Sequence, residues 1–176
     1  ESEQMEVRRL MILPTLFLFQ SVTAFAAPQT TVIDQGRSPT IAPDGSFVAY
    51  RCSYSSNPIL EICLHEVATG LKSDVVFDSS VISDIEIEEI ELSNGAEKIA
   101  FEAEDPYSGK QQVFVYDRTA DSLLRVSLPD TVETFDADAA FSPAITPDGR
   151  YVVFNSTAPY LAPVPSFNDM FLFRYD

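Results

Sequence analysis

The sequence predicts an all-β fold, a partial β-propeller of about three four-stranded antiparallel blades, the last of them incomplete. Three observations support this prediction. The 176 residues include 13 Phe, 7 Tyr and no Trp, alongside many Val and Ile, and aromatic and β-branched residues favour strands. A thirteen-residue pattern occurs twice. Both copies contain Pro-Asp-Gly, a sequence that is typical of a tight turn between two strands.

The repeat gives the period of the fold. Residues 38–50 read SPTIAPDGSFVAY and return at 142–154 as SPAITPDGRYVVF, so seven of thirteen positions are identical at an offset of 104 residues. A weaker copy, SNGAEKIAF at 93–101, lies near the midpoint, and the final aromatic residues of the three copies are 51 and 53 residues apart. A period of about fifty residues with four strands is typical of a propeller blade.

The other strands follow the repeat in each unit. The turn joins a short first strand to an aromatic second strand, because Pro presets φ, Asp accepts a hydrogen bond from the turn backbone and Gly tolerates positive φ. Apolar runs then predict third strands buried on both faces, and further turns lead to fourth strands. We predict third strands at 61–65, 112–116 and 169–173, and fourth strands at 74–77 and 123–128.

The repeated pattern resembles a known family. The copy at 142–154, followed by NDMFL at 168–172, resembles the repeat of TolB-type bacterial β-propellers. The resemblance covers roughly residues 36–176 and is weaker in the second unit, where ELSNG at 91–95 replaces the Ser-Pro-x-Ile-x-Pro-Asp-Gly pattern. It implies a propeller fold. Members of this repeat class serve as protein-binding modules and as parts of hydrolases and lyases, so the fold leaves the function open.

The repeat also predicts how the chain is divided. We expect upstream residues and a signal peptide at 1–26, an N-terminal strand within 27–35, and blades at 36–82, 83–138 and 139–176. The third unit lacks a fourth strand, and the N-terminal strand at 30–33 resembles a fourth strand that would complete the last blade of a closed ring. Propellers need about four to eight blades, so we expect a longer chain to supply further blades.

The N-terminus has the three parts of a secretory signal peptide. Two arginines follow Met5, an apolar run occupies 10–19, and Ala-Phe-Ala at 24–26 predicts cleavage after Ala26. An uncleaved anchor is the alternative, but the apolar run is about ten residues long and a spanning helix needs about twenty. We therefore expect a periplasmic or secreted protein without a membrane span after cleavage.

The charge of the chain restricts its partners. Eleven basic and 27 acidic residues give a net charge of -16. Such a surface repels nucleic acid phosphates and anionic lipid headgroups. We therefore expect no nucleic acid partner, and cationic ligands or metal ions fit this surface better.

The two cysteines leave two alternatives open. Cys52 lies near the end of a second strand and Cys63 in a third strand. A hairpin centred between Asn57 and Pro58 would place them opposite each other, and an exported protein can form a disulfide there. Directly paired positions strain disulfide geometry, so two buried free thiols are the other alternative.

No catalytic or cofactor-binding residues are predicted. His65 is the single histidine, and because it aligns with Tyr116 and Phe173 we interpret it as a substitute for an aromatic core residue. The chain has no Gly-x-Ser-x-Gly elbow and no Gly-x-Gly loop, which are the signatures of many hydrolases and of nucleotide-binding folds.

Two acidic segments have simple structural interpretations. Isoleucines alternate with glutamates along 85–91, as in a strand with one buried and one solvated face. Asp130, Asp136 and Asp138 cluster before the third blade and offer oxygen ligands for calcium. They lack the spacing of an established calcium loop, so solvated loop charge is the competing interpretation.

These observations favour a noncatalytic exported propeller that binds a protein or envelope component. The alternative is the propeller part of an exported peptidase-like hydrolase, or of a lyase, whose catalytic residues lie outside this chain. A third alternative is one module of a large surface protein.

Overall fold

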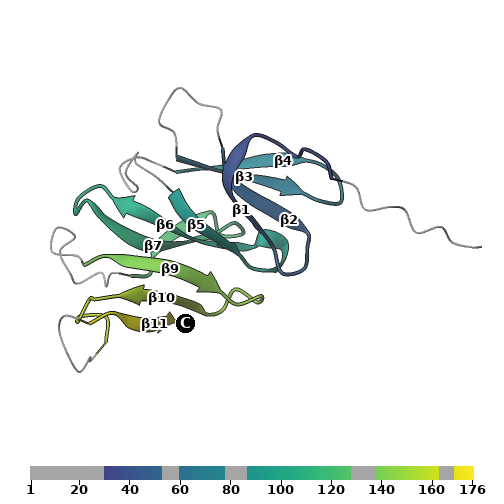
Figure 1. Ribbon diagram of the computed structural model, residues 1–176. Helices are drawn as coiled ribbons and strands as arrows, with labels where there is room; N and C mark the ends of the chain where they lie inside the picture. The colour runs from purple at the N-terminus through teal and green to yellow at the C-terminus, as the bar shows by residue number, and fades with distance from the viewer. Residues whose placement is uncertain (1–29, 53–59, 78–86, 128–137, 163–168) are drawn as a thin grey trace, which may run out of the picture. The chain divides into compact units, whose positions relative to one another are not determined.

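The computed structural model describes residues 30–52, 60–77, 87–127, 138–162 and 169–176. Residues Ile33–Asp176 form one compact unit. Figure 1 shows that the regular structure of this unit consists of strands in three antiparallel sheets, and the described residues form four, four and three strands. The predicted all-β class is therefore confirmed. The predicted signal peptide at 1–26 lies outside the described residues.

The first sheet is a four-stranded meander. It contains β1 (Gly36–Ile41), β2 (Phe47–Cys52), β3 (Leu60–Glu66) and β4 (Lys72–Phe77), paired in chain order. The predicted Pro-Asp-Gly turn joins β1 to β2. The Asp44 carboxylate accepts the Ser46 N–H at 3.0 Å, while the glycine of the turn has a φ of 72°, which a residue with a Cβ rarely adopts.

The second sheet repeats this arrangement. Strands β5 (Ile87–Leu92), β6 (Lys98–Asp105), β7 (Lys110–Asp117) and β8 (Ser122–Arg125) again pair in chain order. The short 3-10 turn η1 (Asn94–Ala96) replaces the Pro-Asp-Gly turn between the first two strands. The weaker second copy of the repeat is thus a blade of the same kind.

The third sheet has three strands among the described residues. They are β9 (Ala140–Ile145), β10 (Val152–Ser156) and β11 (Phe171–Tyr175), with β10 in the middle. The last aromatic residue of the repeat lies on β10, where Phe154 pairs with Phe173, as Phe101 pairs with Phe114 in the second sheet.

Two predicted strand positions were inexact. The last third strand is β11 rather than 169–173, because the pairing of Phe154 with Phe173 sets its register. In the third unit, the residue equivalent to His65 is therefore Tyr175 and not Phe173. The predicted equivalence of His65 with Tyr116 in the second unit is confirmed by the strand pairing. The fourth strand of the second sheet is β8, Ser122–Arg125, and not residues 123–128. The strand ends earlier than predicted, since the side chain of Ser127 enters a buried hydrogen-bond network.

The first strand of every sheet contains a bulge at the same place. Ser38, Glu89 and Ser142 have φ values of 50°, 40° and 53°, and the pairing register shifts around each of them. One residue in the left-handed region is a common feature of a β-bulge. In β5 the bulge lets Ile87 and Ile90, three residues apart, both be buried.

Two hydrophobic clusters join the sheets. The first lies between the first and second sheets, where the fully buried Phe101 has its ring centroid 4.9 Å from that of Phe77 and 5.8 Å from that of Phe114. The second lies between the second and third sheets and contains the stacked pair Phe154 and Phe173. Each sheet therefore buries apolar side chains against its neighbour, as propeller blades do.

The turns between the first and second strands also contact one another. The Asp44 carboxylate accepts the Gly95 N–H at 2.8 Å, and the Pro147 carbonyl accepts the Asn94 N–H at 2.8 Å. The hydrogen bonds from Ser46 and Gly95 favour the charged form, so they lower the pKa of Asp44, the Ser46 side chain having the largest effect. The repeated turn thus links neighbouring sheets as well as neighbouring strands.

Residues 30–33 form no strand in the structure, and the side chain of Val32 is 92% exposed. The expected N-terminal strand at 27–35, of which residues 27–29 lie outside the described part, stays a prediction. A strand is stable only when its backbone groups pair with a neighbour. The ring-closing role of this segment stays a prediction. Within the part of the chain that the structure describes, no helix is long and apolar enough to cross a membrane.

Candidate functional site

Four glutamates gather on the first two strands of the second sheet. Glu88 and Glu89 are exposed on β5, Glu91 is half-buried beside them, and Glu102 on β6 is only 4% exposed. We call these four residues the acidic patch. Glu88 lies directly opposite Glu102 in the strand pairing, an arrangement that is unfavourable for two like charges. The predicted acidic face of this strand is therefore present from residue 87 onward, and residues 85 and 86 lie outside the described part.

The buried members of the acidic patch have raised pKa values. Burial raises the pKa of Glu102, and the nearby charges of Glu89 and Glu88 raise it further, while a hydrogen bond from the Ser142 N–H at 3.0 Å acts in the opposite direction. Burial and then Glu89 raise the pKa of Glu91. Each of these carboxylates is harder to ionise than a free one, so a cationic group placed against the patch would relieve their repulsion.

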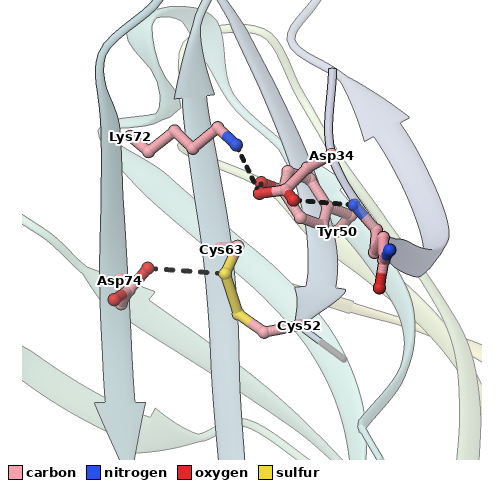
Figure 2. The surroundings of a disulfide bond; sticks show 7 residues. Asp34, Tyr50, Cys52, Cys63, Lys72 and Asp74 are labelled. Atoms are coloured by element: carbon pink, nitrogen blue, oxygen red, sulfur yellow. Dashed lines mark hydrogen bonds and ion pairs between the residues drawn. A yellow bond between two sulfur atoms is a disulfide. The ribbon is translucent and has the colours of Figure 1, made fainter. Parts of the chain in front are cut away.

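The two cysteines are joined in the structure. Cys52 and Cys63 form a disulfide with their Cα atoms 5.5 Å apart (Figure 2). A hairpin centred between Asn57 and Pro58 would place the two cysteines directly opposite each other. This prediction was wrong, because Cys63 pairs with Tyr50. The axis of the hairpin lies one residue earlier, and the bond runs diagonally between β2 and β3. The disulfide lies on the same face of the first sheet as Asp74, which pairs with Cys63 from β4.

A polar cluster near the disulfide was not predicted. One carboxylate oxygen of Asp34 accepts hydrogen bonds from the Tyr50 hydroxyl at 2.8 Å and from the Lys72 ammonium at 2.7 Å (Figure 2). Lys72, followed by Tyr50, lowers the pKa of Asp34 to about 2. Burial, followed by the Asp34 carboxylate, raises the pKa of Tyr50 to about 12. The cluster ties the segment before β1 to β2 and β4.

One sequence signal for this cluster was available. The equivalents of Tyr50 in the other two units are Phe101 and Phe154. A tyrosine at a core aromatic position usually needs a partner for its hydroxyl. Asp34 lies outside the repeat, however, so nothing in the pattern identified it as that partner.

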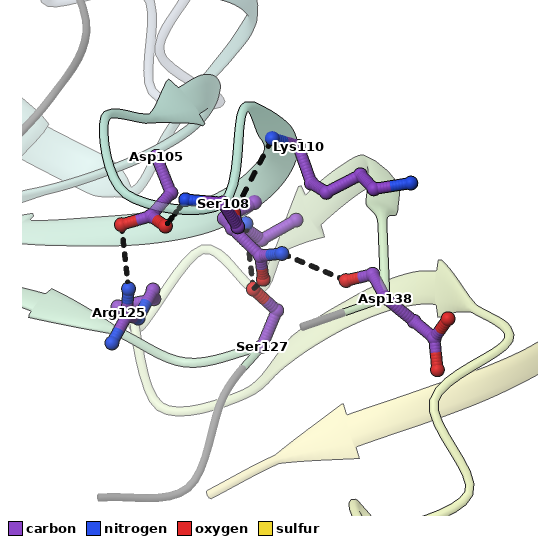
Figure 3. A network of polar contacts seen from close by, with 8 residues as sticks. Asp105, Ser108, Lys110, Arg125, Ser127 and Asp138 are labelled. Atoms are coloured by element: carbon purple, nitrogen blue, oxygen red, sulfur yellow. Dashed lines mark hydrogen bonds and ion pairs between the residues drawn. The ribbon is translucent and has the colours of Figure 1, made fainter. Parts of the chain in front are cut away.

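A second polar network anchors the loop before the third sheet (Figure 3). The fully buried Gln112 donates from its amide to the Asp138 carbonyl at 2.7 Å and accepts from the Ser127 hydroxyl at 2.6 Å. Beside it, the buried Asp105 accepts from the Arg125 guanidinium at 2.8 Å and from the Ser108 N–H at 2.9 Å. The Arg125 Nε atom is buried without a hydrogen-bond partner among the described residues. The other contacts of the network pair buried groups and so stabilise the connection between two sheets.

The calcium hypothesis is not tested by this geometry. Asp130 and Asp136 lie outside the described residues. Asp138 is held through its backbone, by Gln112 and by the Tyr160 hydroxyl, which accepts the Asp138 N–H at 2.7 Å. Figure 3 shows the Asp138 carboxylate directed away from the polar network.

His65 lies in the middle of the first sheet. It is half-buried on β3 between Val48 and Lys72 in the strand pairing, and its Nδ1 is buried without a hydrogen-bond partner among the described residues. In a Ser-His-Asp triad the histidine has a nucleophile on one nitrogen and an orienting acceptor on the other. Neither cross-strand neighbour can supply these roles.

Of three comparisons with known proteins, only the one with solved structures finds similar chains. No family model matches the chain, and no curated protein matches it. The chain is similar to the solved structure of TolB from Acinetobacter baumannii, with a TM-score of 0.50 and 20% identity over 81% of this chain and 30% of that one. Similar structures also include a putative TolB from Agrobacterium tumefaciens, with a TM-score of 0.49, 16% identity and coverage of 81% and 51%.

A third similar structure is the β-propeller domain of the Trilobed protease from Pyrococcus furiosus, with a TM-score of 0.49, 13% identity and coverage of 80% and 40%. This chain spans about a third of the Acinetobacter TolB structure, and at 20% identity the likeness concerns the fold. The sheet topology agrees with it, since each described sheet is an antiparallel meander packed on the next. The chain therefore has the fold of part of a β-propeller and is structurally similar to TolB.

Proposed function

We propose that this chain is the binding module of an exported β-propeller and that it recognises a protein or envelope component carrying cationic groups. The observation that carries the proposal is the acidic patch on β5 and β6. Two of its carboxylates are exposed and two are partly or fully buried beside them. A strand near solvent that concentrates like charge destabilises the fold by itself, and a basic partner compensates for that cost.

The overall charge supports the same class of partner. A net charge of -16 attracts cationic surfaces over distances of about 8 Å at physiological ionic strength. Such attraction mainly increases the rate of association and the discrimination between partners. Binding should therefore weaken as salt is added.

Further blades are part of this proposal. The face of the third sheet that is turned away from the second sheet carries Leu172, which is 71% exposed, and Met170 nearby is 55% exposed. In a propeller this face packs against the next blade. We place the chain in a longer protein whose next blade covers these residues.

Charge reversal on the acidic patch tests the binding proposal. Envelope proteins retained by the wild-type chain are identified and purified, and their affinities are measured for the wild type, for Glu88→Lys/Glu89→Lys and for a control, Glu97→Lys, which reverses one exposed charge outside the patch. Each exposed ion pair contributes about 0.2–1 kcal/mol, so losing two pairs and adding repulsion should weaken binding about tenfold or more, with little effect of the control.

Two results would contradict the proposal. If the double variant binds every purified partner as tightly as the wild type, the acidic patch is not the binding surface. If the longer protein hydrolyses peptides through a nucleophile outside this chain, the peptidase alternative replaces the binding module. Export has its own test, because the N-terminal sequence of the mature protein should begin near Ala27, and an intact product starting at Met5 would refute it.

A further inference from the structure

Three metal-ligating groups meet on the first sheet. One ligand atom from each of Cys52, Cys63 and Asp74 lies within 4.8 Å of the other two. They come from three successive strands, β2, β3 and β4, so the sheet fixes their spacing. Cys63 is 4% exposed, Cys52 is half-buried and Asp74 is exposed. The group is thus anchored in the sheet and open to solvent on the carboxylate side.

The contact between Asp74 and Cys63 has no obvious role while the disulfide is intact. The Cys63 sulfur lies 3.4 Å from the Asp74 Oδ1 atom (Figure 2). A disulfide sulfur carries no hydrogen, so it cannot donate a hydrogen bond to this carboxylate. A thiol in the same place could donate one, which means that the carboxylate suits the reduced cysteine better than the oxidised one.

The spacing also suits a tetrahedral metal ion. Zinc binds thiolate sulfur at about 2.3 Å and carboxylate oxygen at about 2.0–2.2 Å, so neighbouring sulfur and oxygen ligands lie about 3.5 Å apart. The observed separation of 3.4 Å between Cys63 and Asp74 already matches this value. After the sulfur–sulfur bond is broken, rotation of the side chains must separate the two sulfurs. It must also bring the Cys52 sulfur, which lies within 4.8 Å of the Asp74 ligand oxygen, to the same spacing.

We propose that reduction of the Cys52–Cys63 disulfide creates a zinc site made of Cys52, Cys63 and Asp74. A dithiol reductant supplies two electrons and two protons, breaks the sulfur–sulfur bond and leaves as its own disulfide. Zinc then displaces the two thiol protons and binds two thiolates and the carboxylate. Water completes the tetrahedron. A disulfide oxidant that takes up two electrons, and two protons from solvent, to become a dithiol converts the thiolates back to the disulfide and releases the ion. Metal binding at this site is therefore controlled by the redox state of the chain.

Zinc titration of the whole chain tests this site. Oxidised and reduced wild-type protein are titrated with Zn²⁺ against a chromophoric chelator, and Co²⁺ is used in parallel because bound thiolates give it a charge-transfer band. The variants are Cys52→Ser/Cys63→Ser, Asp74→Asn and a matched control, Glu97→Gln, which removes one exposed carboxylate from the second sheet. Circular dichroism checks that each protein is folded.

The expected result is one tightly bound zinc ion per reduced chain and none in the oxidised chain or the double cysteine variant. Asp74→Asn should weaken zinc binding about tenfold or more, since it removes a ligand whose loss is at least as severe as that of an outer-shell partner, and Glu97→Gln should have no effect. The proposal is overturned if reduced wild type binds no more zinc than the double variant, or if Asp74→Asn binds zinc as tightly as wild type. It is also overturned if reduction unfolds the chain and zinc does not refold it.

Discussion

Replacing Phe101 with alanine should destabilise the protein more than most single changes. Phe101 is fully buried on β6, and its ring lies between those of Phe77 from the first sheet and Phe114 from its own sheet. Loss of a buried phenylalanine forfeits about 2–3 kcal/mol of transfer free energy. The surrounding rings can fill the cavity only partly, so the expected total is about 3–5 kcal/mol.

Equilibrium unfolding in urea under non-reducing conditions measures this effect. The midpoint should fall while the slope of the free energy against urea stays constant, because the surface exposed on unfolding is almost unchanged. Leu124→Ala is the matched control. Leu124 lies on the outer strand β8 and is 45% exposed, so its truncation should change the free energy of unfolding by about 0.5 kcal/mol or less. A loss below about 1 kcal/mol for Phe101→Ala would refute the packing of the first two sheets.

Three other experiments test two ion pairs and the disulfide. Arg125→Met leaves the buried Asp105 carboxylate without its ion pair and should lower the free energy of unfolding by about 3 kcal/mol, measured by urea unfolding. Asp34→Asn should flatten the loss of stability between about pH 4 and pH 2. This carboxyl has a folded pKa of about 2 against 3.8, so its contribution is present above the unfolded pKa and is lost as pH falls through the folded pKa. The intact masses with and without reductant should differ by two hydrogen atoms if Cys52 and Cys63 are bonded.

Each of these predictions can fail in a definite way. If Arg125→Met is as stable as wild type, or if Asp105→Asn does not recover part of its loss in a double-mutant cycle, the buried ion pair is not formed. An Asp34→Asn protein with the same acid unfolding curve as wild type would show that Lys72 and Tyr50 do not hold that carboxylate. Equal masses with and without reductant would show that Cys52 and Cys63 are free thiols.

The sheets could be predicted from the sequence because their signals are local and repeated. Pro-Asp-Gly determines a turn through three neighbouring residues, and its recurrence in the first and third units fixes the period. The second unit was found through its spacing, although η1 replaces the turn. A strand shifted by two residues keeps the same residues on each face, so the error at β11 still places Phe173 on the face that packs against the second sheet. The predicted burial of both faces is wrong for this strand, since Leu172 on the other face is 71% exposed.

The polar contacts could not be predicted because they depend on pairing across the fold. The Asp34 cluster joins residues that are 16 and 38 positions apart, and no spacing rule connects them. The network of Gln112 and Ser127 needs the bend that ends β8. The diagonal disulfide required the exact hairpin register, which the residues between β2 and β3 do not specify by composition.

The most direct test of the central claim is the contact between the first two sheets. In an NMR spectrum of the chain with labelled aromatic rings, the protons of Phe77 and Phe101 should show a strong nuclear Overhauser effect, since their ring centroids are 4.9 Å apart. These residues lie on β4 and β6, in different repeats of the sequence. A clear effect is the result that stacked blades predict. Its absence, in a spectrum that shows the effect between Phe101 and Phe114 within the second sheet, would contradict the stacking of the blades.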